Sequence, residues 1–318
     1  MPASSSAAIS TGKPLRIGMI GLDNPRVVSF AKLLHNKGEP NYIGGARLTA
    51  AYPGIPSLDF SLSANRLDGY VEELRDRQRV TMLSSLEEVA EKCDAWMLEA
   101  VDGRTRVALF AQMVPYGKPI FVDKPFALDS STAEEMIRLA AVYGTPWMSC
   151  SALRYAVGLT SGLRSGNGER LCGADFYGPM GLEPTQAGYF WYGIHTAEML
   201  FRALGPDCTE VHAVRTAEHD VVTGVWRDGR IGAIRGNRTG NEAFGGVLHW
   251  TSFSQPFEVK DETDKPYLAS LLEAVVSFLA TGQSPIDLEE TLAIMRFLEA
   301  ANLSLAQKTT IKLRRPIL

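Results

Sequence analysis

Short apolar runs alternate with amphipathic stretches through the first half of the chain. The segment Leu15–Leu22, apolar except for Arg16, is typical of a strand that is covered on both faces. Five similar segments are predicted to be strands: Arg47–Tyr52, Val80–Leu83, Ala95–Ala100, Pro119–Val122 and Trp147–Ser151. Helices are expected between them, at Pro25–Asn36, Ser63–Arg77, Ser85–Lys92, Thr105–Tyr116 and a last segment that reaches Tyr143 and stops at Gly144.

Repeated strand–helix–strand units require a parallel sheet with right-handed crossovers. We therefore expect residues 14–150 to form a Rossmann-type, doubly wound domain, an α/β fold. Ligands of such sheets bind beyond the carboxyl ends of the strands. Capping signals support the helices: Ser85 with Glu88 and Ser131 with Glu134 have capping-box spacing. Asp23 or Asn24 is expected to cap the first helix.

The pattern changes after Ser151. A short helix near Arg154–Leu163 and a helix at Gly193–Leu204 are predicted. The strands expected in this half are Cys172–Tyr177, Glu210–Ala217, Asp220–Trp226, Ile231–Gly236, Gly246–Ser252, Phe257–Val259 and a closing strand at Thr309–Leu313. Arg227–Arg230 contains Asp-Gly, a strong hairpin signal, and successive hairpins indicate a mainly antiparallel open sheet. Two helices, Tyr267–Thr281 and Asp287–Ala306, complete an α+β domain over 151–318, expected to bind substrate and mediate oligomerisation.

Composition narrows the class of protein. The chain has 318 residues, is 45% hydrophobic and carries a net charge of −4. A surplus of acidic groups argues against non-specific nucleic-acid binding, which relies on Lys and Arg facing phosphates. The four cysteines, Cys93, Cys150, Cys172 and Cys208, contain no Cys-x-x-Cys pair, so neither a zinc knuckle nor a disulfide framework is expected.

Residues 1–13 are small and polar, without the basic start and apolar run of a signal peptide. They are expected to form a loose tail. No apolar run reaches the roughly 18 residues that a membrane span needs. We therefore predict a cytoplasmic protein with no membrane partner.

Three stretches resemble the glucose–fructose oxidoreductase/inositol dehydrogenase (Gfo/Idh/MocA) family. Asp123-Lys124-Pro125 follows the fifth strand, where the family usually has Glu-Lys-Pro. Gly193-Ile194-His195-Thr196-Ala197-Glu198 is similar to the family's Gly-x-His-x-x-Asp and opens a helix. The run SPIDLEETLAIMRFLEAANLSLAQKTTIKL is similar in layout to the family's last helix and strand. The resemblance covers about Leu15 to Leu313 and implies an oxidoreductase with NAD or NADP as cofactor.

The same residues suggest chemistry on their own account. Lys124 follows a buried strand, so its ammonium is expected at the carboxyl edge of the sheet, where it would orient a substrate hydroxyl; otherwise it is an ordinary salt-bridged lysine. His195 would accept the hydroxyl proton, or else cap its helix. Glu198, one turn on, either orients the imidazole or is a solvated carboxylate. A metal site is not expected because no third ligand is evident beside His195 and Glu198.

The chain departs from the family in its phosphate loop. The family pattern Gly-x-Gly-x-x-Gly is replaced by Gly21-Leu22-Asp23-Asn24-Pro25-Arg26, in which only the first glycine remains. Arg26 either pairs with a phosphate in compensation or faces water. The second strand ends at Tyr52 without the Asp or Glu that binds the adenosine ribose, so the choice between NAD and NADP stays open.

The remaining candidates lie near the expected substrate. Trp191 stands where the family often has Asp; it offers a face on which a sugar ring can stack, and the neighbouring Tyr192 is a candidate secondary acid. Arg106 falls where the family often has His. Glu99 interrupts an apolar strand and is either paired with a nearby Arg or part of the site. Arg154 and Tyr177 are predicted to line the substrate pocket. The residues predicted to bind the cofactor are Gly21, Leu22, Asp23, Asn24, Arg26, Tyr52, Glu99, Asp102, Arg106, Asp123 and Lys124.

Two classes of function follow from these features. The first is an NAD(P)-dependent oxidoreductase that moves a hydride to or from a secondary alcohol of a sugar, inositol or related polyol. The second is a catalytically inactive or repurposed family member that binds a sugar-like or nucleotide ligand, since the glycines and one Asp are missing. A third variant keeps the fold with a cofactor that never leaves. Apolar residues such as Val221, Val225 and Ile231 predict a homodimer or homotetramer through the second sheet.

Overall fold

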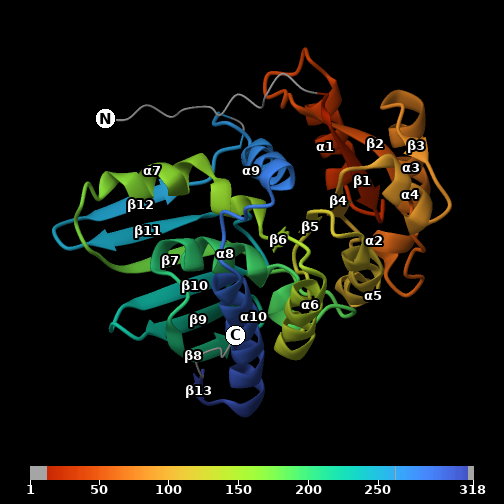
Figure 1. Ribbon diagram of the computed structural model, residues 1–318. Helices are drawn as coiled ribbons and strands as arrows, with labels where there is room; N and C mark the ends of the chain where they lie inside the picture. The colour runs from red at the N-terminus through yellow and green to blue at the C-terminus, as the bar shows by residue number, and fades with distance from the viewer. Residues whose placement is uncertain (1–12, 262, 314–318) are drawn as a thin grey trace.

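The computed structural model describes residues 13–261 and 263–313, so the predicted tail lies outside the described residues except for Lys13. The first sheet has the strand order β3-β2-β1-β4-β5-β6, and every neighbouring pair is parallel. Its strands are β1 (Leu15–Ile20), β2 (Ala46–Tyr52), β3 (Thr81–Met82), β4 (Ala95–Leu98), β5 (Ile120–Val122) and β6 (Trp147–Ser149). The Rossmann-type sheet expected from the sequence is confirmed (Figure 1).

Helices cover both faces of this sheet because its strands are apolar on both sides. One core contains Met97 and residues of α1 (Arg26–His35), α3 (Leu67–Glu72) and α9 (Tyr267–Thr281). The other contains Trp96 and Leu98 with residues of α4 (Leu86–Lys92), α5 (Gly103–Met113) and α6 (Ser130–Tyr143). Successive residues of β4 therefore point to opposite cores.

Two local predictions were wrong. The helix expected at Ser63–Arg77 is divided into α2 (Ser61–Ala64), α3 and a π-helical turn, η1 (Glu73–Arg77). The Ser63 hydroxyl accepts a hydrogen bond from the Ser57 amide and donates one to the Asp23 carboxylate, so this side chain of α2 is engaged outside the helix. Helix α6 is capped by Asp129, which accepts from the Thr132 amide at 2.7 Å, and not by Ser131. The Ser85 cap of α4 is confirmed, with the Ser85 hydroxyl accepting from the Glu88 amide.

The second sheet has seven strands in the order β12-β11-β7-β10-β9-β8-β13. They are β7 (Leu171–Pro179), β8 (Cys208–Arg215), β9 (His219–Trp226), β10 (Ile231–Asn237), β11 (Gly245–Trp250), β12 (Ser254–Glu258) and β13 (Ile311–Lys312). Only β7 and β10 run parallel, and the other pairs are antiparallel. The predicted hairpin joins β9 to β10, with Gly229 at a φ of 88° that a side chain rarely tolerates.

One face of the second sheet packs against helices and the other is open. The covering helices are α7 (Val157–Ser165), α8 (Gly193–Leu204) and α10 (Leu288–Gln307). On the open face Val214, Val221 and Ile231 are 54%, 40% and 56% exposed. The apolar positions predicted for that face are therefore present, with Val225 partly buried beside them.

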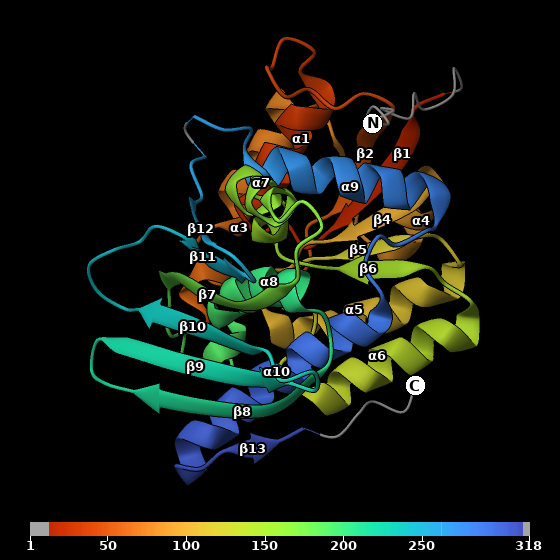
Figure 2. The same ribbon diagram turned by 90° about the vertical axis from the view of Figure 1, so that its left-hand side faces the viewer.

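The two sheets meet through helices from the C-terminal part of the chain. Helix α9 returns to cover the first sheet, and α10 packs against both α6 and α8 (Figure 2). Short helical turns complete the connections: η2 (Val114–Tyr116), η3 (Ala152–Tyr155) and η4 (Gly188–Phe190). Over residues 13–261 and 263–313, no helix combines the length and the apolar character that a membrane span requires.

Candidate active site

Lys124 and Trp191 meet where the two sheets adjoin. Lys124 follows β5, before a cis peptide bond to Pro125, and Trp191 immediately precedes α8. The Lys124 Nζ lies 5.4 Å from the centroid of the Trp191 ring, which attracts an ammonium through the negative face of its π system. Trp191 also packs edge-on against Phe60, at 5.5 Å between centroids, so the ring joins both halves of the chain.

The charge of Lys124 is strongly influenced by its surroundings. Burial, followed by the positive charge of Arg26, lowers the pKa of Lys124 to about 7. Its neighbour Asp123 does not pair with it, because the Asp123 carboxylate forms an ion pair with Arg26. Among the described residues the Lys124 ammonium has no carboxylate partner within ion-pair distance. A lysine in this state can exchange a proton near neutral pH.

His195 lies in the first turn of α8 and shares an aromatic cluster with the lysine. Its ring is 5.6 Å from Tyr192 and 5.9 Å from Phe244, and Tyr192 is itself 6.2 Å from Trp191. Burial and the charges of Lys124 and Arg26 lower the pKa of His195 well below its usual value. The imidazole is therefore neutral at pH 7 and close enough to Lys124 to sense its charge.

A serine that sequence reasoning missed holds the His195 ring. Ser151 Oγ lies 2.6 Å from His195 Nδ1, and the same oxygen accepts from the Leu153 amide. Ser151 follows β6, at the carboxyl edge of the first sheet. This contact occupies Nδ1 and leaves Nε2 as the ring nitrogen for a substrate hydroxyl. The only sequence signal was the position of Ser151 at the end of a predicted strand.

The predicted contact between Glu198 and His195 was wrong. Glu198 is buried and its Oε2 accepts from Arg154 Nη1 at 3.0 Å. Arg154 also pairs with Glu290, at the start of α10, and is 7% exposed, so its charge is neutralised inside the protein. Glu198 is one turn on from His195 but points toward η3. The structure thus gives Arg154 and Glu198 a role in fastening α8 and α10 to the end of β6.

Tyr177 does not lie with the other predicted substrate residues. On β7 the neighbouring Gly178 faces Thr196 of α8 and Phe244, on the helix-covered face of the sheet. Because side chains alternate along a strand, Tyr177 projects from the open face, away from His195. The prediction that Tyr177 lines the substrate pocket was wrong for this reason.

Buried charges lie directly beneath Lys124. Arg26 pairs with Asp123, and the Asn24 amide group donates to Asp123 Oδ2 at 3.0 Å and to the Glu99 carbonyl at 3.1 Å. Burial alone would raise the pKa of Asp123, but Arg26 and Arg106 together lower it. Arg26 therefore does not face water freely, which was one of the two alternatives expected for it, because its guanidinium is paired with Asp123.

Glu99 and Arg106 are also inside this region rather than on a cavity wall. Both side chains are almost completely buried. Burial, and then the charge of Asp123, raise the pKa of Glu99 well above its usual value, and its carboxyl oxygens have no hydrogen-bond partner among the described residues. The Arg106 guanidinium donates to the carbonyls of Ala100, Asp123 and Pro125. Of the two alternatives expected for Glu99, the pairing with an arginine is therefore not found among the described residues.

The altered phosphate loop is firmly held. Gly21 has a φ of 78°, and a Cβ there would lie 2.5 Å from the Ala100 amide nitrogen, so glycine is required. Leu22 is fully buried. Asp23 does not cap α1: its carboxylate accepts from the Val101 amide at 2.8 Å and from Ser63. Asn24 Oδ1 instead accepts from the Arg26 amide at 3.1 Å.

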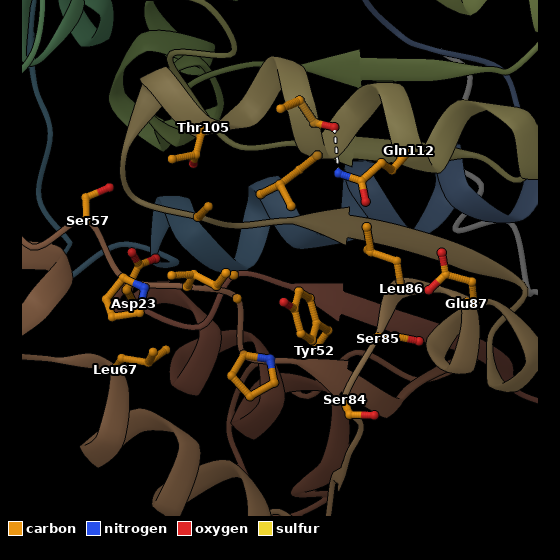
Figure 3. A pocket seen from close by; sticks show the side chains of 18 residues that line it. Asp23, Tyr52, Ser57, Leu67, Ser84, Ser85, Leu86, Glu87, Thr105 and Gln112 are labelled. Atoms are coloured by element: carbon orange, nitrogen blue, oxygen red, sulfur yellow. Dashed lines mark hydrogen bonds between the residues drawn. The ribbon is translucent and has the colours of Figure 1, made fainter.

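A cavity of about 430 Å³ opens beside this loop (Figure 3). Gly21, Asp23 and Tyr52, all predicted cofactor residues, line it together with the segment that follows β2 and part of α5. Asp102, also predicted, is not among its lining residues; it caps α5 and binds Arg104, which lowers the pKa of Asp102 against the effect of burial. The cavity lies beyond the carboxyl ends of β1, β2 and β4, where doubly wound sheets bind nucleotides.

The position, volume and lining of this cavity can be compared with what a dinucleotide requires. The site has a suitable position and a suitable volume for an adenosine half, and the positive-φ glycine is retained at the turn. The second and third glycines are replaced by Asp23 and Arg26, whose side chains turn inward to protein partners. The residues present therefore fit the adenosine part of a dinucleotide. The loop that would contact the diphosphate lacks two of the three usual glycines.

No protein-family model matches the chain, and no curated protein matches it in sequence. Solved structures match it closely in fold. GenD2 from gentamicin A biosynthesis, crystallised with NAD, superposes with a TM-score of 0.76 at 15% identity over 99% of both chains. A myo-inositol dehydrogenase from Corynebacterium glutamicum gives 0.76 at 14% identity, over 95% of this chain and 99% of that one.

The chain has the fold of the inositol dehydrogenases. An oxidoreductase from Agrobacterium radiobacter, crystallised with NAD+, L-tartaric acid and magnesium, is also similar, with a TM-score of 0.72 at 15% identity over 94% of this chain and 98% of that one. The resemblance to the Gfo/Idh/MocA family is thereby confirmed at the level of the fold.

Proposed function

We propose that the chain is a divergent Gfo/Idh/MocA-type oxidoreductase that uses NAD or NADP. Its reaction would transfer a hydride to or from a secondary alcohol carbon of a sugar, inositol or related polyol. One observation carries the proposal: Lys124 and His195, more than 70 positions apart in the printed sequence, share one aromatic cluster in which burial, and then the charge of the ammonium, lower the pKa of the imidazole. Solved structures of the same fold that contain NAD support the choice of cofactor.

Each side chain has a separate task in this reaction. The Lys124 ammonium donates to the reacting oxygen and favours loss of its proton. His195 Nε2 accepts that proton, while Ser151 holds the ring through Nδ1. Trp191 offers its face to the carbon skeleton of the substrate, and Tyr192 lies beside the imidazole as a further hydroxyl donor. The nicotinamide, when bound, accepts or supplies the hydride.

The test separates chemistry from binding. Lys124→Met and His195→Asn should each lower turnover of the best substrate, chosen from a panel of inositols and sugar alcohols, by about 100-fold or more. NADH binding, followed by fluorescence, should stay within about threefold of the unaltered chain, because the cavity does not include these residues. Lys92→Met, an exposed lysine at the end of α4, is the matched control. Undiminished turnover in Lys124→Met would exclude the proposed role.

A repurposed, non-catalytic binder is the second candidate. The observation that favours it is the buried Asp23 carboxylate in the phosphate loop, at a helix end that would otherwise attract an anion. Titration with NADH and NADPH separates the two candidates, since a binder of another ligand would respond to neither. Native mass spectrometry of the purified protein would reveal a cofactor that never leaves.

A further inference from the structure

The cavity beside Gly21 contains two polar side chains that are not used by the protein itself. Six others in its lining are hydrogen-bonded to other parts of the chain: Asp23, Ser57, Ser84, Ser85, Thr105 and Gln112. Among the described residues, the Tyr52 hydroxyl and the Glu87 carboxylate make no hydrogen bond or ion pair. These two groups are therefore available to a ligand.

Tyr52 and Glu87 reach the cavity from adjacent elements. Tyr52 ends β2, and β3 lies parallel to β2 with Met82 opposite Ala51. The turn after β3 leads into α4, whose first turn carries Glu87. In Figure 3 Tyr52 lies between Asp23 and Ser85, and Glu87 lies beyond Ser85. Tyr52 thus stands at the end of strand two, the place where dinucleotide-binding domains hold the adenosine ribose, and Glu87 lines the same cavity from the first turn of α4.

The charges of this cavity suit a ribose with a free 2′-hydroxyl. A carboxylate only accepts hydrogen bonds, so Glu87 suits the hydroxyls of a ribose diol. The described lining contains no lysine, arginine or histidine that would neutralise a 2′-phosphate. Arg104, on the neighbouring α5, has its guanidinium paired with both Asp59 and Asp102. The positive end of α4 is offset by Glu87 and Glu88 in its first turn.

We propose that Glu87, with the Tyr52 hydroxyl, recognises the unphosphorylated ribose of adenosine, so that the chain binds NAD in preference to NADP. Glu87 takes the place of the acidic residue that is missing at the end of the second strand. The inference rests on the proposed function, since it concerns the cofactor of that reaction. It adds a residue that determines specificity and a choice that the sequence left open.

Fluorescence titration with NADH and NADPH tests the inference without any turnover. The unaltered chain should bind NADH about tenfold or more tightly than NADPH, because a phosphate dianion would lie beside an unpaired carboxylate. Glu87→Gln should bring the two affinities closer together, because NADH would bind more weakly and NADPH would no longer be repelled by a carboxylate. Glu87→Arg should remove or invert it. Tyr52→Phe should weaken NADH binding severalfold, because the hydroxyl that would contact the ribose is lost.

Glu91→Arg is the matched control, since it makes the same charge change on α4 at an exposed position outside the cavity lining. Tighter binding of NADPH than NADH by the unaltered chain would overturn the inference and leave the proposed function standing. The same shift of the ratio in Glu87→Arg and Glu91→Arg would also overturn it, because the effect would then come from general charge. Binding of neither nucleotide would overturn the proposed function and this inference together.

Discussion

His195 is held by a neutral hydroxyl and not by a carboxylate. The nearest carboxylate on its own helix, Glu198, is committed to Arg154, while Ser151 Oγ lies 2.6 Å from Nδ1. A neutral partner does not favour the charged imidazolium, so nothing in this contact opposes the lowering of the His195 pKa by burial. The imidazole therefore stays neutral in its resting state and has a ring nitrogen that can accept a proton.

Ser151→Ala should remove the hydrogen bond that orients the His195 imidazole. One hydrogen bond of this kind is worth about 1 kcal/mol, so turnover should fall about fivefold, with a smaller change in KM. Nitrogen NMR of the histidines should show His195 moving from one dominant tautomer toward a mixture, a change that a merely structural role would not produce. Ser151→Thr keeps the hydroxyl, so both the turnover and the dominant His195 tautomer should be like those of the unaltered chain. An unchanged His195 tautomer in Ser151→Ala would contradict the assignment.

Lys124 should titrate near neutrality. Its pKa is lowered from the ordinary lysine range to about 7, so the amine is protonated below that pH and neutral above it. An amine reacts with acylating reagents only when neutral; labelling of Lys124, followed by mass spectrometry, should therefore rise with a midpoint near pH 7. Arg26→Gln should move the midpoint upward, because Arg26 lowers the pKa and also occupies Asp123. A midpoint near that of ordinary lysines, about 10.4, would contradict the environment described.

At the scale of elements, α6 shows how a helix start is chosen. Asp129, Ser130 and Ser131 are all capping residue types in the sequence. In the structure the Asp129 carboxylate accepts from both the amide and the hydroxyl of Thr132, and the Ser130 hydroxyl binds Glu299 of α10. The contact with α10 engages Ser130 and leaves Asp129 as the cap.

Asp129→Ala should therefore lower the free energy of unfolding by about 1 kcal/mol, the usual cost of losing a cap. Ser131→Ala, an exposed position two residues on, is the control and should change it by less than about 0.5 kcal/mol. Urea denaturation followed by circular dichroism measures both. Equal losses of unfolding free energy in the two variants would contradict the assignment of Asp129 as the cap.

At the scale of the whole molecule, α9 packs against the first sheet, and one face of the second sheet has no covering helix among the described residues. Helix α9 belongs to the C-terminal part of the sequence, yet Leu271, Val275 and Phe278 complete a core of the first sheet. This leaves one face of the second sheet without a covering helix, and Val214, Val221 and Ile231 stand exposed on it. An apolar sheet face of this kind is typical of contacts between subunits.

We expect the chain to form a homodimer or homotetramer through that face. Val221→Lys combined with Ile231→Lys should convert the assembly to monomers, because two charges would be desolvated in each copy of the contact. Val142→Lys, at a position of α6 that is 78% exposed, is the control for an added surface charge. Light scattering at micromolar concentration measures the mass. A monomeric unaltered chain would refute the expectation.

The sequence by itself determined most of the elements and their order along the chain. The apolar runs of the first half became six parallel strands, and the Asp-Gly hairpin joined two antiparallel ones. Strands and turns depend on residues within one element, whose periodicity is visible in the chain itself. Lys124 and His195 were singled out mainly because Asp123-Lys124-Pro125 and the motif that begins at Gly193 resemble motifs of the Gfo/Idh/MocA family.

Tertiary structure alone decided the partners of those residues. Ser151 faces His195, Arg154 takes Glu198, and Glu87 enters the cavity beside Tyr52, although nothing local in the sequence pairs them. Each pair joins positions on different elements, so it depends on how the sheets and helices are packed and on which face a strand turns inward. The same reason placed Tyr177 on the open face: alternation along β7 is local, but which side carries α8 is set by the packing of the whole molecule.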